Sequence, residues 1–198
     1  MGSPLRFALV LLAIGLIGFL AWAAAGPDKT AMHVEAPAQR ATGAAAPVAP
    51  PIAAGTTAPR PMIIPVAGVE RSALRDSFNE MRGNHRHEAI DILAPRGTPV
   101  IAADDGVVRK LFTSAAGGLT IYEFDPDQRY CYYYAHLDSY APGLHEGQLL
   151  HRGEVLGYVG TTGNAPKDTP HLHFALIRLD PDRRWWKGTA VNPYPLLR

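Results

Sequence analysis

The stretch His171-Leu172-His173-Phe174-Ala175-Leu176 places two histidines two residues apart in an otherwise apolar run. In a β-strand, successive side chains point to opposite faces of the sheet. Both histidines would then share one face, and the large apolar side chains Leu172, Phe174 and Leu176 would share the other. Such a strand fits a sheet that packs one face on a core and leaves the other open to a cleft. The stretch therefore predicts a half-buried sheet with a polar site on its open face.

A second run of the same kind is Tyr132-Tyr133-Tyr134-Ala135-His136-Leu137. Strict alternation assigns Tyr132, Tyr134 and His136 to one face of a strand. We therefore expect His136 on the open face, where the two tyrosines either line a groove or serve ordinary strand packing. A lone histidine at a strand end would more simply make one hydrogen bond. The two other histidine clusters in the chain favour a role in the site.

The segment His87-Glu88-Ala89-Ile90-Asp91 supplies two more candidate ligands. In a strand, His87 and Asp91 share a face because they lie four residues apart. Neutral imidazole and carboxylate are ligands of catalytic Zn²⁺, which usually takes three protein ligands and keeps a fourth position for water. With His171 and His173 there are four candidates for three places. The surplus predicts a histidine beside the metal that is free for hydrolytic chemistry.

Turn signals rich in glycine and proline divide the rest of this region into short β-type runs, whereas helical periodicity is weak. Short strands at such regular spacing indicate a mainly β fold, an antiparallel sheet or a sandwich-like arrangement. One short helix is expected over residues 71–81. The expected strands cover residues 98–102, 106–112, 119–124, 130–136, 155–159 and 172–177.

The N-terminal region reads as a targeting segment. Residues 7–25 are uncharged and mostly apolar, Arg6 precedes them, and the first acidic residue is Asp28. At a rise of about 1.5 Å per residue, this run measures roughly 28 Å, close to the hydrocarbon thickness of a bilayer. Residues 1–26 are therefore expected to be a signal peptide cleaved near Ala25, or an uncleaved membrane anchor. In either case the rest of the chain is expected to be exported to the periplasm or cell envelope.

Residues 27–60 contain 11 alanines and 6 prolines and no aromatic residue. Such a segment buries too little apolar surface to offset its ordering entropy, so it is expected to be a disordered linker. Residues 61–198 are long enough for one compact domain. Cys131 is the only cysteine, which excludes an intramolecular disulfide. A formal net charge of +1 gives no indication of nucleic-acid binding.

Three motifs occur in a fixed order: His87-x-x-x-Asp91, Tyr134-Ala135-His136-Leu137 and Pro170-His171-Leu172-His173-Phe174. With the framework segments 90–100 and 157–164, they make the domain resemble the lysostaphin/LytM-type zinc metallopeptidases, which cut peptide bonds in bacterial peptidoglycan. The resemblance covers nearly all of residues 61–198. It implies a LytM-type domain, in which a substrate groove lies above a largely antiparallel sheet.

The resemblance also implies roles for individual residues. One Zn²⁺ per chain would be held by His87, Asp91 and His173, and His136 and His171 would be the catalytic histidines. One departure is visible, because the family commonly has glycine where this chain has Ala89. Alanine adds one methyl group, which is tolerable unless φ must be positive at that position.

The function implied is a zinc-dependent endopeptidase that hydrolyses peptidoglycan cross-links or stem peptides by attack of a zinc-bound water. Its expected partners are the peptidoglycan peptide, the membrane through the N-terminal segment, and proteins of cell-wall synthesis or hydrolysis. The alternatives are a non-enzymatic regulator of cell-wall amidases, a wall-binding module, or a domain with structural zinc. Degenerate regulators typically lose site residues, whereas this chain keeps all five. Structural zinc usually has four ligands, often with cysteine.

For three further residues the sequence is consistent with two different roles. His85 could share a face with His87, but a place on the groove rim or in solvent fits better than ligation. Trp185 and Trp186 could present an aromatic patch to glycan or peptide. A tryptophan pair near the end of a domain more often packs its edge closed.

Overall fold

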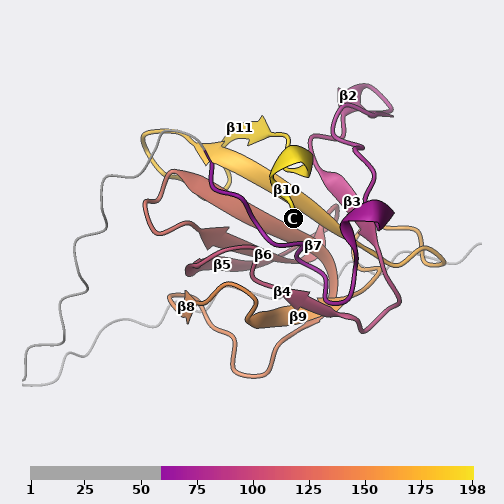
Figure 1. The fold of residues 1–198 in the computed structure, drawn as a ribbon, viewed down its shortest axis with the longest axis horizontal. Coiled ribbons are helices and arrows are strands. Elements are labelled where there is room, and N and C mark those ends of the chain that lie inside the picture. Colours follow the sequence, from indigo (N-terminus) through magenta and orange to yellow (C-terminus); the bar gives the residue numbers. More distant parts are fainter. Residues whose placement is uncertain (1–58) are drawn as a thin grey trace, which may run out of the picture. The chain divides into compact units, whose positions relative to one another are not determined.

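The computed structural model describes residues 59–198 (Figure 1). The expected signal or anchor segment, and the expected linker up to residue 58, lie outside the described residues. Within residues 59–198, no helix is long and apolar enough to cross a bilayer.

The described chain is mainly β, and every pair of named strands is antiparallel, as predicted. Each of the six predicted runs contains most of an observed strand. The predicted helix over 71–81 is wrong, because only a 3-10 turn, η1, forms there. In chain order the elements are η1 Arg71–Ala73, β1 Met81–Arg82, β2 His85–Arg86, β3 Ile90–Leu93, β4 Pro99–Ile101, β5 Gly106–Ser114, β6 Gly118–Phe124, β7 Tyr130–Tyr140, β8 Leu149–Leu150, β9 Val155–Val159, β10 His171–Leu179, β11 Gly188–Val191 and η2 Tyr194–Leu196.

The main sheet runs in the order β11-β10-β7-β6-β5-β8, with β3 on β10, and β9 linking β7 to β4. Strand β10 is central to the site because it pairs with β7 on one side and with β3, then β11, on the other. In this register His173 lies opposite Asp91 on β3 and opposite Ala135 on β7. The β1–β2 hairpin projects beside β3 (Figure 1). The pairing therefore brings residues from three distant segments into one row.

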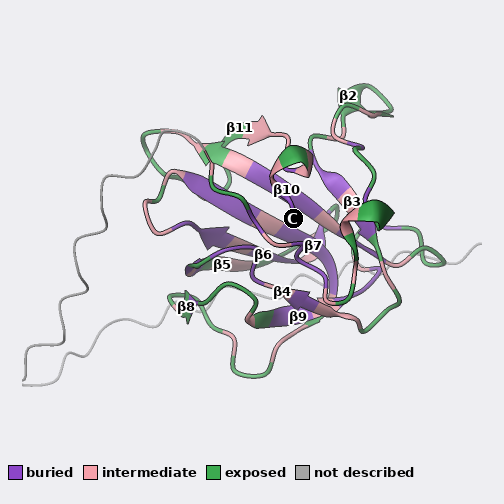
Figure 2. Ribbon diagram, viewed as in Figure 1, coloured by how far each residue is buried: buried purple, intermediate pink, exposed green. Residues whose placement is uncertain are grey.

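The core lies on the face of β10 opposite its histidines. Leu172, Phe174 and Leu176 are fully buried there, as the alternating pattern predicted. Ile90 and Ile92 of β3 join the same cluster, and Figure 2 shows buried residues along β7 and β10. Burying each such side chain contributes about 1.5–3 kcal/mol, so this face holds the sheet together. The opposite face is left for polar residues.

The alternation expected in β7 is wrong at His136. This residue has φ 61°, in the left-handed region that few non-glycine residues adopt. Opposite it, β7 uses one residue more than β6, which makes a β-bulge. Tyr132 and Tyr134 consequently belong to the core, while His136 lines the open face with Tyr133 and Ala135. Of the two roles open to Tyr132 and Tyr134, the structure therefore shows packing in the core and not a place in the groove.

Tyr134 lies in the core because its hydroxyl finds partners there. It donates to Glu123 Oε2 at 2.6 Å and accepts from the backbone N–H of Ala103 at 3.0 Å. Glu123 is fully buried, and burial raises the pKa of its carboxyl to about 8, even though the Tyr134 hydrogen bond acts in the opposite direction. Glu123 is therefore largely protonated at neutral pH, which avoids an unpaired buried charge.

Candidate metal centre

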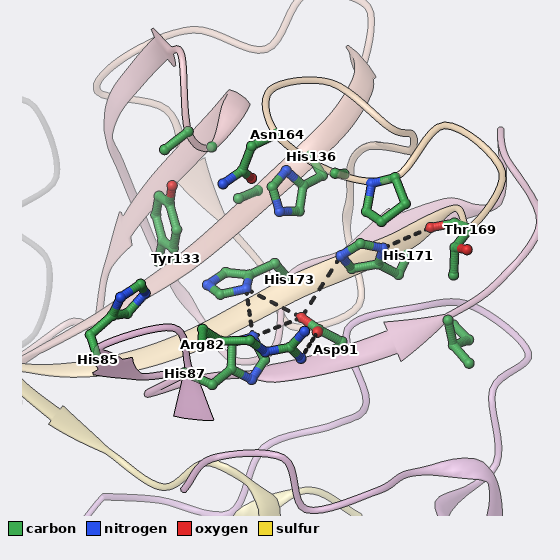
Figure 3. A pocket seen from close by; sticks show the side chains of 16 residues that line it. Arg82, His85, His87, Asp91, Tyr133, His136, Asn164, Thr169, His171 and His173 are labelled. Carbon is green, nitrogen blue, oxygen red and sulfur yellow. Dashed lines mark hydrogen bonds and ion pairs between the residues drawn. The ribbon is translucent and has the colours of Figure 1, made fainter. Parts of the chain in front are cut away.

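Three donor atoms meet above the open face of the sheet (Figure 3). His87 Nε2 lies 3.0 Å from Asp91 Oδ1 and 3.0 Å from His173 Nδ1. The third side, from His173 Nδ1 to Asp91 Oδ1, measures 3.2 Å. Donors 2.0–2.1 Å from a shared tetrahedral ion are separated by about 3.3 Å. Both the spacing and the chemistry of this donor set fit a Zn²⁺ ion with one open position.

His87 and Asp91 meet for a reason other than the one expected. Strand β3 begins at Ile90, so His87 precedes the strand and the strand alternation does not apply to it. Glu88 has φ 57°, which turns the chain between the two ligands. The backbone N–H of His87 donates to Glu80 O at 2.8 Å and fixes the loop. Ala89 is buried without a positive φ, so the departure from glycine at this position is accommodated.

Outer contacts orient the donor atoms. The carbonyl oxygen of Ser77 can only accept, so His87 Nδ1, at 3.2 Å from it, carries the proton and leaves Nε2 free to bind a metal. Ser77 Oγ also accepts from the Asp91 backbone N–H at 3.3 Å. Arg82 Nη2 donates to Asp91 Oδ2 at 2.8 Å and leaves Oδ1 facing the histidines. Sequence reasoning missed Ser77 and Arg82, which lie in and just after the segment read as a helix.

The protonation states suit a cation. Burial would raise the pKa of Asp91, but the close contacts of its carboxylate with the His173 and His87 rings outweigh that effect and hold the pKa well below its usual range. Burial lowers the pKa of His173. The site therefore presents a carboxylate and neutral imidazole, the forms that bind metal.

His136 and His171 lie over the same space, with ring centres 5.0 Å apart. His136 Nδ1 donates to Thr162 O at 2.9 Å, and His171 Nδ1 donates to Thr169 O at 2.8 Å. Because both acceptors are carbonyls, both Nε2 atoms remain free for other partners. His171 Nε2 is 3.8 Å from Asp91 Oδ1 (Figure 3). Burial, assisted by the neighbouring His173 and His171, lowers the pKa of His136 to about 4, so His136 is neutral at pH 7.

All five predicted site residues line one open pocket of about 590 Å³. His85 lies exposed at its rim, as the sequence suggested, and Tyr133 forms part of its wall (Figure 3). The structure thus brings together every residue that was expected in the site.

Residues 85–193, more than half of the 198-residue chain, match the model of Peptidase family M23. The chain belongs to this peptidase family. The L-Ala–D-Glu endopeptidase of Bacillus subtilis (strain 168) is 37% identical over 132 residues, which are 63% of this chain and 39% of that protein. The chain thus spans about two fifths of that relative's length.

Two solved structures share the fold. A LytM-type structure from Ruminococcus gnavus is 32% identical with a TM-score of 0.54, over 69% of this chain and 57% of that chain. A variant of the catalytic domain of the prophage-encoded M23 protein EnpA from Enterococcus faecalis is 26% identical with a TM-score of 0.51, over 61% and 88% of the two chains. These matches confirm the LytM-type resemblance that the sequence motifs indicated.

Two glycine-containing turns hold His136 in this M23 domain. The carbonyl of Gly117 accepts from the His136 backbone N–H at 2.8 Å. Gly118 has φ 65°, and a Cβ there would collide with Thr162 Oγ1. Gly163 has φ 70°, and a Cβ there would collide with the Ala116 carbonyl and the Gly118 backbone nitrogen. Only glycine permits this backbone packing, which delivers the Thr162 carbonyl to His136.

Proposed function

We propose that this M23 protein is a zinc-dependent endopeptidase that hydrolyses peptide bonds of bacterial peptidoglycan. The observation that carries the proposal is the arrangement of one open pocket. Three donor atoms at tetrahedral spacing face two histidines whose rings are held through Nδ1 by backbone carbonyls. Structural zinc sites are closed by four ligands, whereas this donor set supplies three.

We assign the ligand positions to His87, Asp91 and His173. Zn²⁺ held there would supply a Lewis acid that polarises a peptide carbonyl and lowers the pKa of water in the open position towards 7. Arg82 keeps Asp91 in place through the carboxylate oxygen that faces away from the histidines. Ser77 holds the His87 ring in the orientation that binds metal.

We assign proton transfer to His136 and His171. His136 is neutral at pH 7, so its Nε2 can accept a proton from the attacking water. His171, in its protonated form, can donate from Nε2 to the oxyanion or the leaving amine. The hydrogen bonds from both Nδ1 atoms to backbone carbonyls fix the orientation of the two rings before substrate binds.

Peptidoglycan is the proposed substrate because one relative is named a peptidoglycan DD-endopeptidase, and the Bacillus relative is also named an endopeptidase. That relative's name specifies an L-Ala–D-Glu bond, and for this chain the proposal is limited to a cross-link or stem-peptide bond. The apolar run 7–25 supports a location in the cell envelope, at the membrane or in the periplasm. Proteins of wall synthesis or hydrolysis are its proposed partners there.

The test is hydrolysis of purified peptidoglycan sacculi by the full-length protein. About one equivalent of bound zinc, and release of free amines that stops with a chelator and returns with zinc, supports the proposal. Stoichiometric zinc without amine release from any of several wall types contradicts it. Stimulation of a wall amidase under those same conditions would favour the regulator reading.

A further inference from the structure

An unbroken row of aromatic rings leads away from the candidate metal centre. Tyr133 lies edge-on to His173 with ring centres 6.0 Å apart. Tyr122 follows at 4.7 Å from Tyr133, and Trp185 follows at 4.7 Å from Tyr122. Phe112 and Trp186 both contact Trp185, at 5.3 and 5.1 Å. We call Tyr133, Tyr122, Trp185, Phe112 and Trp186 the aromatic row.

The row lies on the open face of the sheet. Tyr122 on β6 and Tyr133 on β7 are direct cross-strand partners, and their neighbours Ile121 and Tyr134 point to the core instead. Every ring of the row keeps some exposure, which reaches 58% for Trp186. Tyr133 also lines the metal pocket, so the row and the pocket form one continuous surface.

The chemistry of the row selects an uncharged, flat ligand. The face of an aromatic ring carries partial negative charge, so it attracts C–H groups and repels carboxylates. Strands β6 and β7 are each paired on both sides, so the middle of the row offers no free backbone edge to an extended peptide. Pyranose rings, with C–H groups on their faces, match this surface better than an anionic stem peptide.

Building on the proposed function, we propose that the aromatic row binds the glycan strand of peptidoglycan while the attached peptide enters the metal pocket. Trp185 lies at most about 15 Å from His173 along the ring centres, the span of roughly four extended residues. Stem peptides hang from the sugar, so the row is within reach of the sugar when a stem-peptide bond lies at the metal. Arg184, stacked 5.4 Å from the Trp186 ring centre, adds hydrogen-bond donors for sugar hydroxyls.

The first test measures sugar binding without turnover. The zinc-loaded full-length protein is titrated with a β-1,4-linked N-acetylglucosamine hexamer, which has the backbone of the glycan strand and no peptide. Tryptophan fluorescence and calorimetry report binding. We expect Trp185→Ala to weaken it about tenfold and Trp186→Ala to weaken it less. Leu149→Ala, an exposed apolar residue on β8, is the matched control and should change nothing.

The second test separates this proposal from the proposed function. Trp185→Ala should slow hydrolysis of sacculi while hydrolysis of a sugar-free stem peptide continues at the wild-type rate. Hexamer binding that depends on Trp185 supports the row even if no bond is ever cut. Absent hexamer binding, or equal binding by the wild type and both tryptophan variants, overturns it. The Trp186 side chain is mostly exposed. If Trp186→Ala lost binding of the stem peptide, the row would bind peptide and not glycan, and the proposal would be overturned.

Discussion

Replacing His173 and His136 by alanine separately tests the division between ligands and catalysts. His173 Nδ1 is one of three donors at 3.0–3.2 Å spacing, and its loss leaves only two. His136 contacts no ligand atom through a hydrogen bond and is held instead by Thr162. We therefore expect His173→Ala to lose metal, and His136→Ala to keep metal and lose activity.

The expected magnitudes differ in kind. Losing a hydrogen-bond partner of a metal ligand lowers metal affinity by about 10–100-fold, so losing a ligand itself should lower the affinity by more than about 100-fold. Losing an acid–base group lowers the rate by about 10²–10⁴-fold, which corresponds to a barrier about 3–5 kcal/mol higher. His136→Ala also gives up one hydrogen bond, which contributes about 1 kcal/mol to stability. That is small beside a typical unfolding free energy of about 5–15 kcal/mol, so the variant should fold.

The assay combines metal stoichiometry after dialysis, zinc affinity against a competing chelator, and amine release from sacculi. His136→Asn is the matched control, because asparagine tolerates the left-handed backbone at φ 61°. His136→Asn should keep metal and lose activity, as His136→Ala does, if activity depends on the imidazole and not on the local backbone. Equal loss of metal in His173→Ala and His136→Ala would refute the division, and so would full activity in His136→Ala.

Three further predictions concern the backbone and core around the site. Because the pKa of Glu123 is raised from 4.5 to about 8, its neutral form stabilises the fold fully at low pH. Denaturant titrations should show the wild type losing about 1.4 kcal/mol per pH unit relative to Glu123→Gln between those values, and a constant difference would contradict the buried neutral carboxyl. Gly118→Ala should cost at least about 2 kcal/mol from its positive φ and collision, whereas Gly143→Ala, at φ 81° in open space, should cost about 1 kcal/mol; equal costs would argue against the packed turn. Glu88→Gly should leave stability equal or higher because Glu88 has φ 57°, whereas Ala89→Gly should lose about 0.5–1 kcal/mol in the same titration. The reverse order would contradict a left-handed turn at Glu88.

Local sequence patterns were enough to predict the fold class and the residues of the site. The alternation in residues 171–176 placed both histidines opposite the core because β10 is a regular strand throughout. The motifs contained five of the residues that line the pocket, because imidazole and carboxylate are the groups that hold a catalytic metal. Residues 71–81 were misread as a helix because their hydrogen bonds form only short turns there. The carbonyls of Phe78 and Glu80 accept from the backbone N–H groups of Glu88 and His87 in the following loop instead of from a helical turn.

Alternation and motifs were enough to predict a half-buried antiparallel sheet with an imidazole and carboxylate site on one face. The tertiary structure alone decided which way His136 points, because a single φ of 61° moves it to the face of Tyr133 and sends Tyr134 into the core. That angle depends on two turns packing at distances only glycine allows, a contact between segments more than forty residues apart. It likewise decided that Trp185 joins Tyr122 and Phe112 in one row. Such pairings between distant segments leave no periodic trace in the sequence, so only the folded chain reveals them.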